Sequence, residues 1–371
     1  MAKARSARLL TARLAGGMLL SACWLCAAAT AAVQDRSLRQ LRFSPDGRYV
    51  LAQNGAEIAV LTVQPFALRF RIPAQDATDA QFTPDSRQVV FLGAATRVDN
   101  QKVMFAGSSA HVDRWDIRAQ ARAQSQIIPM FGCGTQQLSP DALVLACVDF
   151  EGTLRLIDAS SGQVIVERKN FVRLLGIYGY RTDLPVAFLD DRGSAHMDFS
   201  ADGRYFLAVP WGRNGRALAY DMRDKHTLAP KDGLGWLRGA AAENVLFAFV
   251  GVDRMLMTRH GFGEVKHGAK TGRLVAFPSG RVVSKPKVPP GRFLGATGAG
   301  SVIIRPFGPL EQYDQSKRAA AVGLGSGEVV VSDTPAIDVF GRYYIAEPSP
   351  GVVGLYERGK GLQATVALHP K

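Results

Sequence analysis

A five-residue phrase recurs along the chain and constrains the fold more than any other feature of the sequence. Its four copies lie at residues 43–47 (FSPDG), 82–86 (FTPDS), 138–142 (LSPDA) and 199–203 (FSADG). Serine or threonine starts a turn by side-chain bonding to the backbone, proline presets φ at the second position, and glycine takes the positive φ that closes the turn. Such self-similarity is typical of folds built by repeating one supersecondary unit.

A second phrase overlaps the first and continues it as a strand. Gly-Arg-Tyr followed by an apolar run occurs at residues 47–52, 203–208 and 341–346, and a weaker copy lies at 291–296. Aromatic and β-branched residues favour strands, so each copy predicts a strand, a tight turn and another strand. No long stretch shows sustained 3.6-residue periodicity, so we expect almost no helix after residue 33.

A family resemblance follows from these repeats. Residues 138–166 resemble one WD-type repeat, and Trp115-Asp116 supplies a WD dipeptide. The pattern over residues 37–371 resembles the WD-repeat and YVTN-like group of β-propellers, which includes the periplasmic TolB-like propellers. This resemblance implies an all-β propeller of four-stranded blades and, most often, a binding or scaffolding role.

The length of the chain limits the number of blades. Residues 33–371 divided by seven give about 48 residues per blade, near the ~40–50 of known propeller repeats. We expect one propeller domain over residues 33–371, with seven blades preferred and eight possible. The predicted blade segments are residues 37–73, 74–129, 130–170, 171–232, 233–286, 287–333 and 334–371. The last segment is expected to form a complete blade without a strand from the N-terminal end.

Residues 1–32 have the pattern of a signal peptide. Four basic residues precede residues 14–33, which carry no charge and end in a small-residue run with cleavage options such as Ala-Thr-Ala at 29–31. One alternative is an uncleaved N-terminal anchor, because the uncharged stretch could just span a bilayer. Another is a lipoprotein, because Leu-Ser-Ala before Cys23 resembles a lipobox. All three export the remaining chain, so we predict a periplasmic or secreted bacterial protein.

Two cysteines remain after the signal segment, Cys133 and Cys147. An even pair in an oxidising compartment favours a disulfide. The two residues flank the turn at 139–142, so a hairpin about that turn brings them near each other. A β-bulge is then needed to put both side chains on one face. The alternative is a pair of buried free thiols.

No sequence motif indicates an enzyme. The chain lacks a Gly-x-Ser-x-Gly nucleophile elbow, a Cys-x-x-Cys-His haem motif and a phosphate loop followed by a helix. His260, Glu264 and His267 have suggestive spacing, but intervening glycines leave no helix to fix zinc ligands. We therefore predict no catalytic residue, cofactor or metal. A hydrolase, lyase or redox site built from scattered polar residues at a central channel stays open as an alternative.

The formal net charge is +13, and basic residues gather between residues 254 and 292. Arg259, Lys266, Lys270 and Arg273 form a candidate face for an anionic partner such as an acidic glycan, a lipid headgroup or an acidic protein. An ordinary basic surface is the alternative. Nucleic acid is not expected as a partner because the chain is exported, and membrane contact is expected only through the signal or anchor segment.

These observations favour one function over two others. The leading hypothesis is a monomeric, non-catalytic propeller that binds a protein or an anionic polymer of the cell envelope. The channel enzyme is the second hypothesis. A purely structural envelope component is the third.

Overall fold

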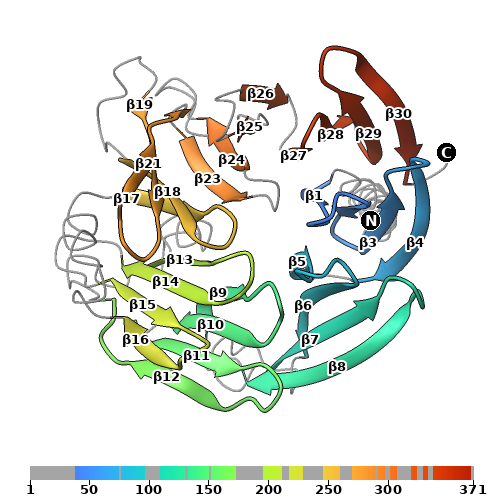
Figure 1. The fold of residues 1–371 in the computed structure, drawn as a ribbon. Coiled ribbons are helices and arrows are strands. Elements are labelled where there is room, and N and C mark those ends of the chain that lie inside the picture. The colour runs from blue at the N-terminus through green and yellow to red at the C-terminus, as the bar shows by residue number, and fades with distance from the viewer. Residues whose placement is uncertain are drawn as a thin grey trace, which may run out of the picture. The chain divides into compact units, whose positions relative to one another are not determined.

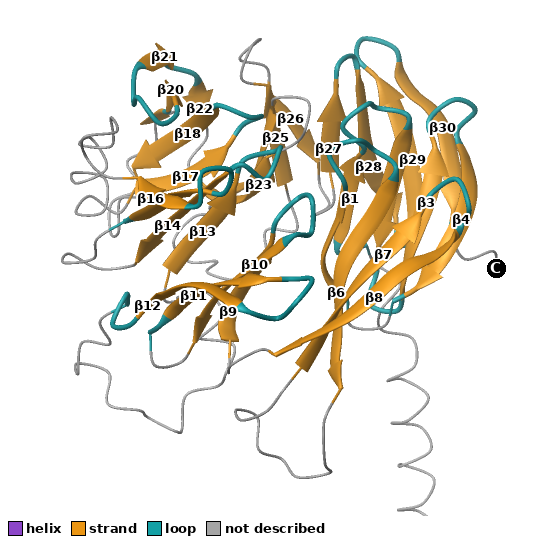
Figure 2. Cartoon of the chain, turned by 60° about the horizontal axis from the view of Figure 1, so that its bottom comes forward, coloured by secondary structure: helices purple, strands orange, loops and turns teal. Residues whose placement is uncertain are grey.

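The computed structural model contains β-strands and no helix among its described residues (Figure 2). The predicted scarcity of helix is therefore confirmed for this part of the chain. The predicted signal segment lies outside it. The described residues are 38–74, 77–96, 109–129, 133–149, 152–172, 195–210, 217–228, 245–259, 270–288, 291–296, 301–306, 319–323, 329–332 and 337–368.

The described strands pair into seven four-stranded antiparallel sheets and one two-stranded sheet. We number the four-stranded sheets in chain order. The first sheet comprises β1 (Gln40–Phe43), β2 (Tyr49–Gln53), β3 (Glu57–Thr62) and β4 (Ala67–Pro73). The second comprises β5 (Thr78–Phe82), β6 (Gln88–Thr96), β7 (Ser109–Asp116) and β8 (Ala121–Pro129). The third comprises β9 (Cys133–Leu138), β10 (Val144–Asp149), β11 (Leu154–Asp158) and β12 (Val164–Arg168).

The later sheets follow the same order. The fourth comprises β13 (Ala195–Phe199), β14 (Tyr205–Pro210), β15 (Leu218–Asp221) and β16 (His226–Leu228). The fifth comprises β17 (Val245–Phe249), β18 (Arg254–Arg259), β20 (Arg273–Ala276) and β21 (Val282–Ser284), and β19 (Lys270–Thr271) pairs with β22 (Lys287–Val288). The sixth comprises β23 (Gly291–Ala296), β24 (Ser301–Pro306), β25 (Ala319–Gly323) and β26 (Val329–Ser332). The seventh comprises β27 (Ile337–Phe340), β28 (Tyr343–Ser349), β29 (Val352–Glu357) and β30 (Gly361–Ala367).

Each four-stranded sheet lies within one of the segments that the repeats delimited. Within a sheet, each strand pairs with the next along the chain, apart from β18, which pairs with β20. The seventh sheet draws all its strands from residues 337–367, so it is complete without an N-terminal strand, as expected.

The hydrophobic core lies between sheets rather than within any one of them. Five described clusters of buried apolar side chains each join two sheets: first to second, second to third, third to fourth, fourth to fifth, and seventh to first. Strand β17 also contacts β23, and β25 contacts β27. Successive sheets therefore meet face to face, and the last meets the first (Figure 1). Radial repetition of four-stranded sheets is the architecture of a β-propeller, so the predicted all-β propeller fold is confirmed.

The recurring phrase forms the same hydrogen-bonded turn in all four copies. In the first copy, the Tyr49 N–H donates to Ser44 Oγ at 2.9 Å, and Ser44 Oγ donates to Asp46 Oδ1 at 2.7 Å. The Arg48 N–H donates to the same Asp46 oxygen at 3.0 Å. Equivalent bonds start from Thr83, Ser139 and Ser200. The predicted role of serine or threonine is therefore confirmed, and the aspartate side chain accepts further hydrogen bonds that hold the turn.

The fifth position of the phrase has positive φ in every copy. The values are 72° at Gly47, 59° at Ser86, 55° at Ala142 and 72° at Gly203. Glycine adopts this conformation without steric cost, whereas serine and alanine do so against their usual preference. Gly47 has a second requirement, because a Cβ there would overlap the ring of Phe340 in the seventh sheet.

Candidate functional site

Every sheet has two ends that differ in the length of their connections. The turn end carries the links between first and second strands and between third and fourth strands, including the recurring phrase. The loop end carries the remaining links. These include the longest between described strands, from Thr96 to Ser109, from Arg168 to Ala195, from Leu228 to Val245 and from Pro306 to Ala319. Insertions that gather at one face of a repeat fold often mark its binding face, so the loop end is the candidate binding end.

Two of the four basic residues predicted for the anionic face lie at the loop end of the fifth sheet, and a third lies on β19 of the two-stranded sheet, which contacts β18. Arg259 ends β18, Lys270 begins β19, and Arg273 begins β20. The register pairs Met257 of β18 with Arg273, which places the backbones of Arg259 and Arg273 at the same end of the sheet. The side chain of Arg273 is exposed. Lys266 lies outside the described residues.

The same sheet carries further exposed cations at its turn end and outer edge. Arg254 is exposed, and its Nε lies 3.8 Å from Asp253 Oδ1. Arg281 and Lys285 flank the outer strand β21, and both are exposed. Isolated surface ion pairs contribute only about 0–1 kcal/mol, so Asp253 masks Arg254 weakly. The fifth sheet is therefore basic at both ends among the residues described.

Cys133 and Cys147 form a disulfide between β9 and β10, with their Cα atoms 5.5 Å apart. The expected bulge is present, because Cys133 pairs with Asp149 and leaves Gly134 as the extra residue. The hairpin loop differs slightly from the expectation. The predicted turn at 139–142 is present, because the Ala142 N–H donates to the Ser139 carbonyl at 2.8 Å, but the Ser139 N–H also donates to the Val144 carbonyl, so the hairpin loop covers residues 140–143. The bulge restores the parity that puts both cysteines on one face.

A set of inner-strand polar residues was missed by the sequence analysis. They occupy one register position, opposite Leu51, Val90, Ala146, Leu207 and Ile345 of the second strands. The set is Arg42, Gln81, Gln137, Asp198 and Asp338. A signal for it does exist, because the residue directly before the phrase is polar in all four copies. The fifth sheet has Ala248 at this position.

Four of these side chains bond to the next sheet around the ring. Gln81 Nε2 donates to the carbonyls of Leu138 and Ser139, both at 3.0 Å. Gln137 Nε2 donates to Asp198 Oδ1 at 3.1 Å. The two aspartates act as acceptors instead. The Phe249 N–H donates to Asp198 Oδ2 at 2.6 Å, and the Phe43 N–H donates to Asp338 Oδ2 at 2.7 Å.

The environment changes the acidity of both aspartates. Burial raises the pKa of Asp338 to about 7, because the ionised form loses its hydration. Burial likewise raises the pKa of Asp198 to about 6. Backbone N–H donors favour the ionised forms and oppose both shifts. The positive charge of Arg42 favours the ionised form of both carboxyl groups. All three residues lie on inner strands of the ring, β1, β13 and β27 (Figure 1).

The described residues contain no group of three histidine, cysteine, aspartate or glutamate side chains that could hold a metal ion. The weak candidates His260, Glu264 and His267 lie outside the described residues. In the portion of the chain that the structure covers, no helix has both the length and the apolarity to cross a membrane.

Comparison with known proteins adds a structural similarity. No family model and no curated protein matches the chain. Among solved structures, the chain is similar to the β-propeller domain of Cps50 (Swd1) from Myceliophteria thermophila, with a TM-score of 0.46 and 13% sequence identity. The alignment covers 88% of this chain and 94% of that one.

Proposed function

We propose that this chain is an exported, seven-bladed β-propeller that binds an anionic protein or polymer of the cell envelope through the loop end of its fifth sheet. One observation carries the proposal. Arg259 and Arg273, chosen from the sequence for their charge alone, share one end of the fifth sheet, and Lys270 begins the neighbouring strand β19, which contacts β18. Charges of one sign gathered at one place raise the local concentration of oppositely charged partners.

The disulfide supports export. Disulfides persist in oxidising compartments such as the periplasm and are rare in reducing ones. The Cys133–Cys147 bond agrees in this respect with the basic and then apolar pattern of residues 1–32. The blade number is supported by the seven four-stranded sheets among the described residues.

The alternative of an enzyme with a site at the central channel has less support. Arg42, Asp198 and Asp338 lie on inner strands of the ring (Figure 1), where a channel enzyme would place its polar groups. However, every carboxylate oxygen of the two aspartates already accepts a backbone N–H. Joining neighbouring sheets therefore accounts for these residues, and we propose binding rather than catalysis.

Charge reversal tests the proposed site. We expect Arg259→Glu, Lys270→Glu and Arg273→Glu, combined in one variant, to weaken binding to an immobilised acidic polysaccharide such as alginate. A surface charge generally contributes about 0–1 kcal/mol, so the combined loss from three replacements should be roughly tenfold. The loss should shrink as salt rises, because exposed charges are screened within ~8 Å at physiological ionic strength.

A matched control separates the site from the overall charge. Arg87, Arg254 and Arg281 are exposed at turn ends, and their combined change to glutamate alters the net charge equally. We expect this control to retain most of the binding at low salt. Equal losses in the two variants would show that net charge, rather than the loop end of the fifth sheet, attracts the partner. Equal binding by wild type and the loop-end variant would reject the site.

A further inference from the structure

The junction between the first and seventh sheets is unlike every other junction in the ring. All other neighbouring sheets follow one another along the chain, whereas these two lie at opposite ends of the described residues. No strand is shared between them, because the seventh sheet is complete by itself. We call the contact of β1 with the seventh sheet the seam. Side-chain contacts and hydrogen bonds alone must hold it closed.

Two acidic side chains of the seventh sheet hold the backbone of the first. Glu347 Oε1 accepts the Leu38 N–H at 3.0 Å, and Asp338 Oδ2 accepts the Phe43 N–H at 2.7 Å. Leu38 lies just before β1 and Phe43 ends it, so the two carboxyl groups bind both ends of this strand. Arg71 of the first sheet adds a hydrogen bond to the Leu368 carbonyl.

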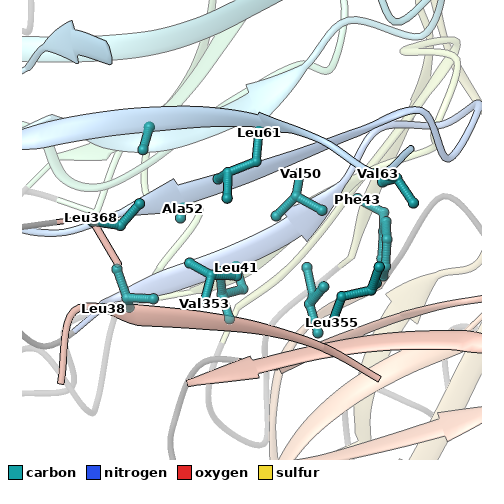
Figure 3. Close-up of a cluster of buried hydrophobic side chains, with 12 residues drawn as sticks. Leu38, Leu41, Phe43, Val50, Ala52, Leu61, Val63, Val353, Leu355 and Leu368 are labelled. Atoms are coloured by element: carbon teal, nitrogen blue, oxygen red, sulfur yellow. The ribbon is translucent and has the colours of Figure 1, made fainter. Parts of the chain in front are cut away.

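Water is largely excluded from the seam. Asp338 is 2% exposed and Glu347 is 4% exposed. The strand between their two contacts packs apolar side chains against the seventh sheet, and Figure 3 shows Leu41 beside Val353 in this cluster. An ionised carboxylate is costly in such surroundings unless a cation or enough donors compensate it.

Few charged groups face the two carboxyls. Arg42 on β1 acts on Asp338, whose neighbour β25 carries no titratable residue. The side chain of Arg305 on β24, which also contacts β27, lies outside the described residues. Glu347 receives hydrogen bonds from the Leu38 and Gly351 N–H groups. Burial raises the pKa of Glu347, and it raises that of Asp338 to about 7.

We propose that the seam is a pH-sensitive clasp, which stays closed while Asp338 and Glu347 hold their protons and loosens as these side chains ionise. When the seam opens, both carboxyl groups reach water and regain their ordinary acidity. The open state then releases protons that the closed state retains. Each carboxyl therefore increases the opening equilibrium by up to about tenfold per pH unit, from its ordinary pKa to its raised one. For Asp338 this range is about pH 4 to 7.

Hydrogen exchange measures this opening directly. We would record exchange of the purified protein between pH 5 and 8 by mass spectrometry and correct each rate for the intrinsic pH dependence of exchange. Protection of the segment from Leu38 to Phe43 should fall with rising pH. The matched segment around Phe249 also donates a backbone N–H to an aspartate, the half-buried Asp198, but its two sheets follow each other along the chain. Its protection should fall less.

The conservative substitution Glu347→Gln removes a titratable carboxyl group and keeps an oxygen that can accept its two backbone hydrogen bonds. Leu38 and Gly351 both donate to the same oxygen, Glu347 Oε1, at 3.0 and 2.8 Å. A glutamine amide oxygen can accept both bonds. We therefore expect Glu347→Gln to stay folded and to reduce the pH dependence of protection at Leu38, leaving the part due to Asp338. Asp338→Asn, added to it, should flatten the remaining dependence.

Three results would overturn the clasp. Protection at Leu38 and Phe43 that is constant between pH 5 and 8 would do so. A wild-type pH profile in the Glu347→Gln variant would exclude the role of that side chain. An equal loss of protection around Phe249 would show that buried carboxyl groups loosen the ring generally and that the seam is not special. None of these results bears on the basic loop end, which lies in a different sheet.

Discussion

Residue type at a single register position decides how four of the described sheets bond to the next. Glutamine at this position donates to a carbonyl or carboxylate, as Gln81 and Gln137 do. Aspartate accepts a backbone N–H, as Asp198 and Asp338 do. Both solutions satisfy polar groups that would otherwise be buried without partners at the sheet junctions. These sheets thus keep a polar side chain at the same register position but vary whether it donates or accepts the hydrogen bond.

Gly47 offers a sharp test of packing at the residue scale. Gly47→Ala places a side chain at positive φ and against the Phe340 ring, so we expect the free energy of unfolding to fall by about 2–4 kcal/mol. Gly341→Ala is the control, because Gly341 also has positive φ but nothing lies within 4 Å of its added Cβ. That change should cost only about 1–2 kcal/mol. Urea denaturation measures both, and equal losses would contradict the role of Phe340.

Hairpins were predictable at the element scale because their interactions are local. Each copy of the phrase contains its own donors and acceptors within six residues, from Ser44 to Tyr49 in the first copy. Likewise, the cysteine pair is separated by only 14 residues. The inner polar position was missed because its partners are distant. Asp338 and Phe43 are 295 residues apart, and only closure of the ring brings them together.

A prediction at the element scale concerns the disulfide that joins β9 and β10. Replacing Cys133 and Cys147 by serine removes a crosslink that closes a loop of about 15 residues, which corresponds to roughly 3 kcal/mol in the chain-entropy model. We expect the free energy of unfolding to fall by about that amount. Dithiothreitol should destabilise the wild type to a similar extent and leave the double variant unchanged. A wild type that is insensitive to reductant after unfolding and refolding would contradict the stabilising role of the bond.

At the scale of the whole molecule, some groupings of charged residues were predictable from the sequence and others were not. The basic stretch was predictable as a group because Arg259, Lys270 and Arg273 are close in sequence, and the strand register then places the backbones of Arg259 and Arg273 at one end of the fifth sheet. The electrostatic coupling of Arg42 to carboxyl groups in the fourth and seventh sheets was not predictable, since it depends on how many sheets complete the ring.

Two groups of aspartates change the stability of the protein with pH in opposite directions. Burial raises the pKa of Asp198 to about 6 and that of Asp338 to about 7, so their contribution to stability is present below about pH 4 and is lost as pH rises toward 7. Turn aspartates such as Asp46 and Asp85 behave oppositely. Partial burial raises their pKa, but the hydrogen bonds from Ser44 and Thr83, the backbone N–H donors and the neighbouring arginine charges together outweigh it and lower the pKa of both groups. Their contribution is lost as pH falls through those lowered values.

We therefore expect the free energy of unfolding to be highest near pH 4 to 5 and to decline up to about pH 7. Urea unfolding in steps of one pH unit measures the profile. Asp198→Asn and Asp338→Asn, tested singly, should each make the decline shallower, even where they lower stability overall. Stability that rises steadily from pH 4 to 7 would contradict the assigned directions.

The completeness of the seventh sheet has a consequence for the order of the chain. Leu38 and Leu368 belong to the same buried cluster, so the two ends of the described chain meet at the seam (Figure 3). Because no strand crosses from one end to the other, the fold has no intrinsic first blade. A circular permutant that joins these ends through a short linker and opens the chain between two other sheets keeps every strand pairing intact.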